Sequence, residues 1–191
     1  MATRRYLPTL VSIFVLIGAL SGCGSRLDDP NHPATPHDIA QAEAMMRQLP
    51  SVQETEQQLS ALMWRIAEAT RSVAPALDWQ PKTDRAQGTL GCPSPYSETD
   101  GVSMTADSIY SPVPIADAEW PEVLRITRDL AAQHGITALT VRADEPGHHD
   151  ITLHSPDDGN EISVGSRKAA LITGLTGCRL RAQDIENPTS K

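Results

Sequence analysis

The sequence predicts an α+β domain, a two-layer sandwich in which helices pack on one face of a mostly antiparallel sheet of four to five strands. Three observations predict this fold. Three segments carry apolar residues at helical spacing, the last third of the chain alternates apolar and polar residues, and short turn-forming clusters separate the alternating segments. Such short connections join strands that are antiparallel neighbours.

Two helices are expected at the start of the domain. Thr35 is a suitable N-cap for a short helix that runs to about Leu49. Ser51 and Glu54 then have capping-box spacing and begin a long amphipathic helix that ends before Pro75. We expect its apolar face to pack on the sheet of the same domain. A coiled-coil partner is the alternative, but the run spans barely three heptads. The expected apolar face consists of Val52, Thr55, Leu59, Leu62, Met63, Ile66, Ala69 and Val73.

The middle of the chain is predicted to be less regular. Residues 75–101 are rich in Pro, Gly, Asp, Ser and Thr and are expected to form a loop, in which Trp79 and Cys92 are attached to the body. Residues 102–110 show weak alternation, which predicts a strand. A further helix is expected to have Asp117 as its N-cap and to end at Gly135. Its buried residues would be Val123, Leu124, Thr127, Leu130 and Ala131.

Four strands are predicted after this helix, over residues 137–143, 150–154, 161–166 and 169–180. The linkers 145–147 and 155–160 consist of turn-forming residues, so the four strands are expected to form an antiparallel meander. The last of these strands would carry Cys178.

The N-terminus has the form of an export signal. Arg4 and Arg5 precede an uncharged apolar run that is shorter than the roughly 20 residues needed to cross a bilayer. Residues 20–23, Leu-Ser-Gly-Cys, resemble the bacterial lipobox, in which the signal is removed before the cysteine and the thiol takes the lipid, such as palmitate. We therefore expect the chain to be extracytoplasmic and anchored by Cys23 to the cell membrane. An ordinary signal with an incidental Cys23 is the alternative, and the arginine pair leaves both Sec and Tat export open.

The expected organisation is a signal peptide over residues 1–22, a lipidated flexible tether over 23–34, one domain over 35–182 and a disordered tail over 183–191. Both signal arginines leave with the signal, so the formal charge of −8 becomes about −10. An acidic surface repels nucleic acid, and we expect no nucleic-acid partner. We expect the mature protein to be a monomer.

Cys92 and Cys178 remain as a pair in a compartment where thiols oxidise, which favours a disulfide. The bridge would close a loop of about 85 residues, for which chain entropy predicts roughly 4 kcal/mol of stabilisation. Two free thiols or a metal site are the alternatives, although no CxxC spacing accompanies the two cysteines.

One cluster of titratable residues could hold zinc in principle: His148, His149, Asp150, His154, Asp157 and Asp158. Strand alternation places His148, Asp150, Thr152 and His154 on one side and His149, Ile151 and Leu153 on the other. The first set is expected to face water, as the polar outer face of a sheet does. We therefore expect no metal site.

The chain has no GxSxG, SxxK, HExxH, GxxxxGK[ST] or GxGxxG motif. We therefore expect no catalytic residues, no enzyme activity and no cofactor. The expected function is a non-catalytic module that binds a protein or a small or lipidic ligand in the envelope. The alternative is a hydrolase-like envelope enzyme without a recognisable motif.

In addition to the lipobox, the chain contains the motifs Leu49-Pro50-Ser51-Val52, Trp120-Pro121, His134-Gly135-Ile136-Thr137 and Gly177-Cys178-Arg179-Leu180. Together these motifs resemble those of the mycobacterial LppA/LppV-type lipoproteins. The resemblance implies a cell-envelope lipoprotein with no assigned activity and with its paired cysteines bridged. It provides no catalytic residues to transfer.

Overall fold

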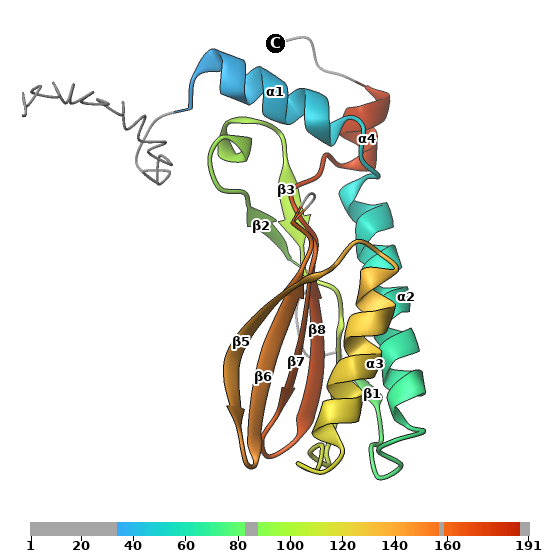
Figure 1. The fold of residues 1–191 in the computed structure, drawn as a ribbon. Helices are drawn as coiled ribbons and strands as arrows, with labels where there is room; N and C mark the ends of the chain where they lie inside the picture. The colour runs from blue at the N-terminus through green and yellow to red at the C-terminus, as the bar shows by residue number, and fades with distance from the viewer. Residues whose placement is uncertain (1–33, 83–87, 157–158, 188–191) are drawn as a thin grey trace, which may run out of the picture. The chain divides into compact units, whose positions relative to one another are not determined.

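The structure is a computed structural model that describes residues 34–82, 88–156 and 159–187. The predicted signal peptide, the lipidation site Cys23 and nearly all of the tether lie outside these ranges. Helices α2 and α3 lie side by side on one face of a six-stranded sheet (Figure 1). All neighbouring strands of this sheet are antiparallel. The predicted α+β sandwich is confirmed.

The two N-terminal helices begin at capping boxes. Helix α1 (Pro36–Met46) is capped by Thr35 and ends earlier than predicted. Helix α2 (Val52–Thr70) is capped by Ser51, whose Oγ accepts from Glu54 N at 3.2 Å. The Ser51 N–H donates in return to the Glu54 carboxylate at 2.9 Å. Helix α2 therefore has the predicted cap, and its buried residues are Val52, Thr55, Leu59, Leu62, Met63, Ile66, Ala67 and Thr70.

Helix α3 (Trp120–Ala132) begins later than predicted, and its N-cap is Glu119, which makes no side-chain capping bond. The prediction that Asp117 caps this helix is wrong, because the Asp117 carboxylate accepts from Gly147 N and lies against His149 instead. The helix ends as expected. Gly135 has φ +73° and the chain turns there, a conformation that glycine adopts without strain.

The sheet has the strand order β1-β4-β8-β7-β6-β5, six strands rather than the predicted four to five. The strands are β1 (Gln80–Lys82), β4 (Ser108–Ser111), β5 (Ala138–Glu145), β6 (His148–His154), β7 (Glu161–Ser166) and β8 (Ala170–Leu175). Strands β5 to β8 form the predicted meander. The additional strand β1 comes from the predicted loop. Its Pro81 is tolerated because an edge strand needs no N–H on its free side.

The strand predicted over residues 102–110 is two strands in two sheets. Strand β3 (Val102–Met104) pairs with β2 (Thr89–Gly91) in a small second sheet, whereas β4 joins the main sheet. A short 3-10 helix, η1 (Tyr96–Glu98), lies between β2 and β3. The intervening residues Thr105 and Ala106 contact the β8 side of the main sheet, where Ala106 N donates to Gly174 O.

The predicted last strand is also shorter than expected. Strand β8 ends at Leu175, and Cys178 lies in the extended segment that follows it. Arg179 in this segment pairs with Val102 by backbone hydrogen bonds in both directions. A short helix, α4 (Ala182–Glu186), begins at the last residue of the predicted domain and continues into the segment that was predicted to be a disordered tail.

The core lies between the helices and the inner face of the sheet. Helix α2 packs on β8 and β4, and α3 packs on α2. Trp79 holds the segment after α2 against the end of that helix, since its buried indole N–H donates to Thr70 Oγ1 at 3.2 Å. The sheet contributes Ile109, Ile151, Leu153, Ile162, Val164, Ala170 and Ile172 to this core.

Candidate functional site

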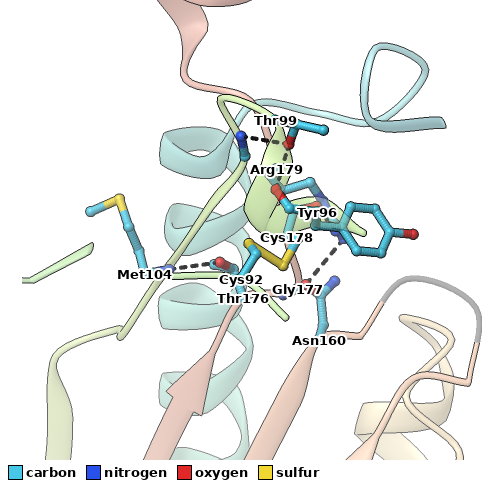
Figure 2. The surroundings of a disulfide bond; sticks show 10 residues. Cys92, Tyr96, Thr99, Met104, Asn160, Thr176, Gly177, Cys178 and Arg179 are labelled. Carbon is cyan, nitrogen blue, oxygen red and sulfur yellow. Dashed lines mark hydrogen bonds between the residues drawn. A yellow bond between two sulfur atoms is a disulfide. The ribbon is translucent and has the colours of Figure 1, made fainter. Parts of the chain in front are cut away.

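Cys92 and Cys178 form a disulfide, as the sequence analysis expected, with Cα atoms 5.9 Å apart across 86 residues. Figure 2 shows the polar contacts beside it. Asn160 Oδ1 accepts from Gly177 N at 2.9 Å and from Arg179 Nη2 at 3.2 Å. Arg179 is 1% exposed and also donates from Nη1 to Cys178 O. The disulfide joins the residue after β2 to the segment after β8, and the Asn160 bonds hold that segment against the residues that lead into β7.

A groove of about 390 Å³ lies beside the disulfide. Its apolar lining includes Met45 near the end of α1, Leu49 after α1, Leu90 of β2, Pro93 of the following loop and Tyr96 of η1. Met45 and Leu90 are 44% and 47% exposed. This end of the domain therefore presents apolar side chains to solvent.

A second feature is a buried histidine, His149, near the start of β6. His149 is 6% exposed, and its ring stacks on Trp120 with centroids 4.5 Å apart and planes 13° apart. Its Nδ1 lies 2.7 Å from Asp144 Oδ1 and its Nε2 lies 3.0 Å from Asp117 Oδ1. The cluster joins the β5–β6 hairpin to the segment that leads into α3.

The electrostatics of this cluster follow from its hydrogen bonds. The Gly147 N–H, and then the His149 ring, lower the pKa of Asp117 below its usual value. The His149 ring also stacks on the Trp120 indole, which is a favourable arrangement of two aromatic rings.

The same contacts indicate what the cluster can do chemically. A histidine that activates a nucleophile needs one nitrogen free to accept a proton, and both His149 nitrogens face carboxylates. Ser166 lies directly opposite His149 on β7, but its hydroxyl is bonded to the backbone of Ile115 in both directions. The geometry is that of a structural contact rather than that of a Ser-His-Asp site.

Strand β6 places the zinc candidates as the alternation predicted. His149, Ile151 and Leu153 point into the core, and His148, Asp150 and His154 lie on the outer face and are partly exposed. The expectation that Thr152 faces water with them is wrong, since Thr152 is only 8% exposed and its hydroxyl lies 2.8 Å from that of Ser163 on the neighbouring strand. Asp157 and Asp158 lie outside the described residues. Within the described ranges, no three His, Cys, Asp or Glu side chains are grouped as metal ligands.

A third feature lies where the sheet extends beyond its helical cover. Among the residues that the structure describes, strand β5 is an edge strand that pairs only with β6. Val141 shares the core-facing side of the sheet with its partner Ile151, yet Val141 is 53% exposed and Ile151 is 1% exposed. The helical layer therefore covers β6 and the start of β5, where Leu139 packs against the core, and leaves Val141 uncovered.

A groove of about 520 Å³ runs along α3 and borders the start of β5, since Thr137 lines it and so does Leu153, the partner of Leu139. Helix α3 forms one wall with Leu124, Arg128 and Ala132 among others, and the opposite wall includes Ile136 and Leu153. We call this the α3–β5 groove. Sequence reasoning missed this groove, because its walls come from elements that are separate in the sequence. The exposure of Val141 on the neighbouring strand is likewise visible only in the structure.

Of the predicted site residues, the structure brings Cys92 and Cys178 together, and Cys23 lies outside the described ranges. In residues 34–82, 88–156 and 159–187, none of the helices has the length and apolar character needed to cross a bilayer. A disulfide-bridged α+β domain behind a lipobox is the arrangement of an envelope-associated lipoprotein.

The comparison with family models identifies the family. The model of LppA, described as a lipoprotein confined to pathogenic Mycobacterium, matches residues 27–182, and the chain belongs to this family. No curated protein matches the chain.

Two solved structures are similar. The crystal structure of LppA from Mycobacterium tuberculosis has a TM-score of 0.69 and 20% identity, over 81% of this chain and 92% of that chain. At that identity the likeness shows the fold. A DUF4853 family protein from Actinomyces odontolyticus has a TM-score of 0.38 and 10% identity, over 68% of this chain and 72% of that chain. No argument rests on the second.

Proposed function

We propose that this lipoprotein is anchored to the outer face of the cell membrane by lipid on Cys23 and that its domain is a non-catalytic binding module. The main support for binding is the α3–β5 groove, together with Val141, which lies on the core-facing side of the neighbouring strand β5 and is 53% exposed. A partly exposed apolar groove beside an edge strand is typical of a binding surface.

The His149 cluster argues against the enzyme alternative. His149 is the most deeply buried of the described histidines, and its two ring nitrogens are engaged by Asp117 and Asp144. The anchor is supported by the lipobox at residues 20–23 and by membership in a lipoprotein family. A double acyl chain is sufficient for stable membrane attachment.

Two experiments test the proposal. For the anchor, the wild-type protein is expected to partition into the detergent phase and a Cys23→Ser variant into the aqueous phase; equal partitioning would refute the anchor. For binding, detergent-solubilised envelope is captured on wild-type protein, on Val141→Lys and on Leu90→Lys. We expect at least one specific partner to be lost with Val141→Lys and kept with Leu90→Lys. A captured set that neither substitution changes would contradict the module.

A further inference from the structure

The free edge of β5 offers backbone hydrogen-bonding groups. Strand β5 is the last strand in the order β1-β4-β8-β7-β6-β5, so alternate residues direct N–H and C=O groups away from β6. Residues 138–141 pair with β6 in regular register. This part of the edge has the hydrogen-bonding pattern that the main chain of an extended peptide complements.

The other half of the edge is protected against pairing. The register shifts between Val141 and Ala143, which marks a β-bulge at Arg142. The Arg142 guanidinium binds Asp150 at 2.8 Å, and Asp144 binds His149. Bulges and charged residues are the usual means by which an edge strand avoids unspecific association. Only residues 138–141 are therefore open to a further strand.

This open half lies next to the α3–β5 groove. Leu139 and Val141 are on the core-facing side of β5, and Leu153, the partner of Leu139, lines the groove. In an added strand, alternate side chains would point to the same side as Leu139 and Val141. Those side chains would enter the groove and cover Val141, so they must be apolar.

The charges at the rim add a second requirement. Arg125 is held by Glu122 and Asp129, both at 2.6 Å. Arg128, which is exposed and lines the groove, makes no ion pair with any described residue. A carboxylate on the incoming segment would pair with this guanidinium.

We propose that the α3–β5 groove binds an extended segment of a partner protein, which adds to residues 138–141 as a strand and places alternating apolar side chains against α3. This inference rests on the proposed binding function and names the class of partner. The segments after residue 22 that lie outside the described ranges do not fit, because none has alternating apolar residues: residues 23–33 contain two prolines and one leucine, residues 83–87 are Thr-Asp-Arg-Ala-Gln, residues 157–158 are Asp-Asp and residues 188–191 are Pro-Thr-Ser-Lys. A second copy paired through β5 would bring the bulge and the charged residues of both copies into the interface.

The test uses the full lipoprotein in detergent and a synthetic peptide in which Val and Thr alternate and which ends in Glu. NMR titration to millimolar peptide is expected to shift the amides of residues 136–141 and of α3. Val141→Lys should weaken the peptide affinity by about tenfold or more, because the ammonium replaces the apolar contact. Val113→Lys is the matched control, since Val113 is an exposed valine outside the groove, and should leave the affinity unchanged.

A second peptide separates strand addition from apolar adsorption. N-methylation of alternate residues removes the amide hydrogens on one edge and keeps every side chain, so the affinity is expected to fall by about tenfold or more. Equal binding of both peptides, or no shifts at millimolar peptide, would overturn strand addition. Concentration-dependent dimerisation that Val141→Lys abolishes would assign the edge to a second copy and would also overturn it. In either case, loss of an envelope partner with Val141→Lys would still support the binding module.

Discussion

Truncation of His149 should destabilise the domain more than any other substitution of a described histidine. His149→Ala removes two short hydrogen bonds to carboxylates, at 2.7 and 3.0 Å, and the stack on Trp120. Hydrogen bonds to charged groups contribute about 1.5–3 kcal/mol each, and an aromatic pair about 0.5–1.5 kcal/mol. The side chains of Asp117 and Asp144 are about half exposed and regain water after truncation, which favours the lower end of these ranges.

The expected loss in the free energy of unfolding for His149→Ala is therefore about 3.5 kcal/mol, or about 7–14 °C in melting temperature. This loss is measured by urea unfolding, followed by tryptophan fluorescence and far-UV circular dichroism. The dependence of the free energy of unfolding on urea concentration is expected to stay unchanged. His148→Ala is the matched control, because the neighbouring ring is partly exposed and its contact to Glu145 is 3.4 Å. A loss below about 1 kcal/mol for His149→Ala, or an equal loss for the control, would refute the reasoning.

Three further predictions concern pH, helix capping and the disulfide. Because its hydrogen bonds lower the pKa of Asp117, the ionised carboxylate stabilises the fold; this contribution is complete above the unfolded pKa of about 3.8 and is lost as pH falls through the lower folded value. Urea midpoints should therefore fall less steeply below about pH 4 in Asp117→Asn than in the wild type, and parallel profiles would contradict this. Ser51→Ala should cost about 1 kcal/mol in urea unfolding, since it removes the cap of α2, and an unchanged midpoint would count against that role. Reduction of the Cys92–Cys178 bridge should cost about 4 kcal/mol, measured by unfolding with and without reductant, and the double serine variant should be insensitive to reductant.

The elements that the sequence predicts well are those with local causes. Ser51 and Glu54 are three residues apart, so the capping box of α2 can be recognised without any tertiary information. The same holds for the hairpin between β5 and β6, where Pro146 and Gly147 form the turn and Gly147 has φ +73°. Alternation along β6 likewise predicted that His149 faces the core.

The errors arise where a distant partner decides the outcome. Asp117 has the side chain of an N-cap, but the hairpin of β5 and β6 supplies stronger partners in Gly147 and His149. Strand β1 forms within a Pro-rich segment because β4 offers it an edge, which local propensity cannot show. Residues 102–110 divide between two sheets for the same reason.

The candidate site was harder to predict than the fold. The lipobox and the cysteine pair are visible in the sequence, and the structure joins Cys92 to Cys178. The α3–β5 groove depends on how far α3 extends over the sheet. Val141 has the pattern of a core residue in the sequence, and only its 53% exposure distinguishes it from Ile151.

The central claim is that Cys23 carries the lipid that holds this domain at the membrane. Mass spectrometry of the N-terminal peptide of the protein purified from envelope tests this claim most directly. The account predicts a peptide that begins at Cys23 and carries two or three acyl chains, with residues 1–22 absent. A peptide that retains the signal, or one that begins at another residue with an unmodified thiol at Cys23, would contradict it.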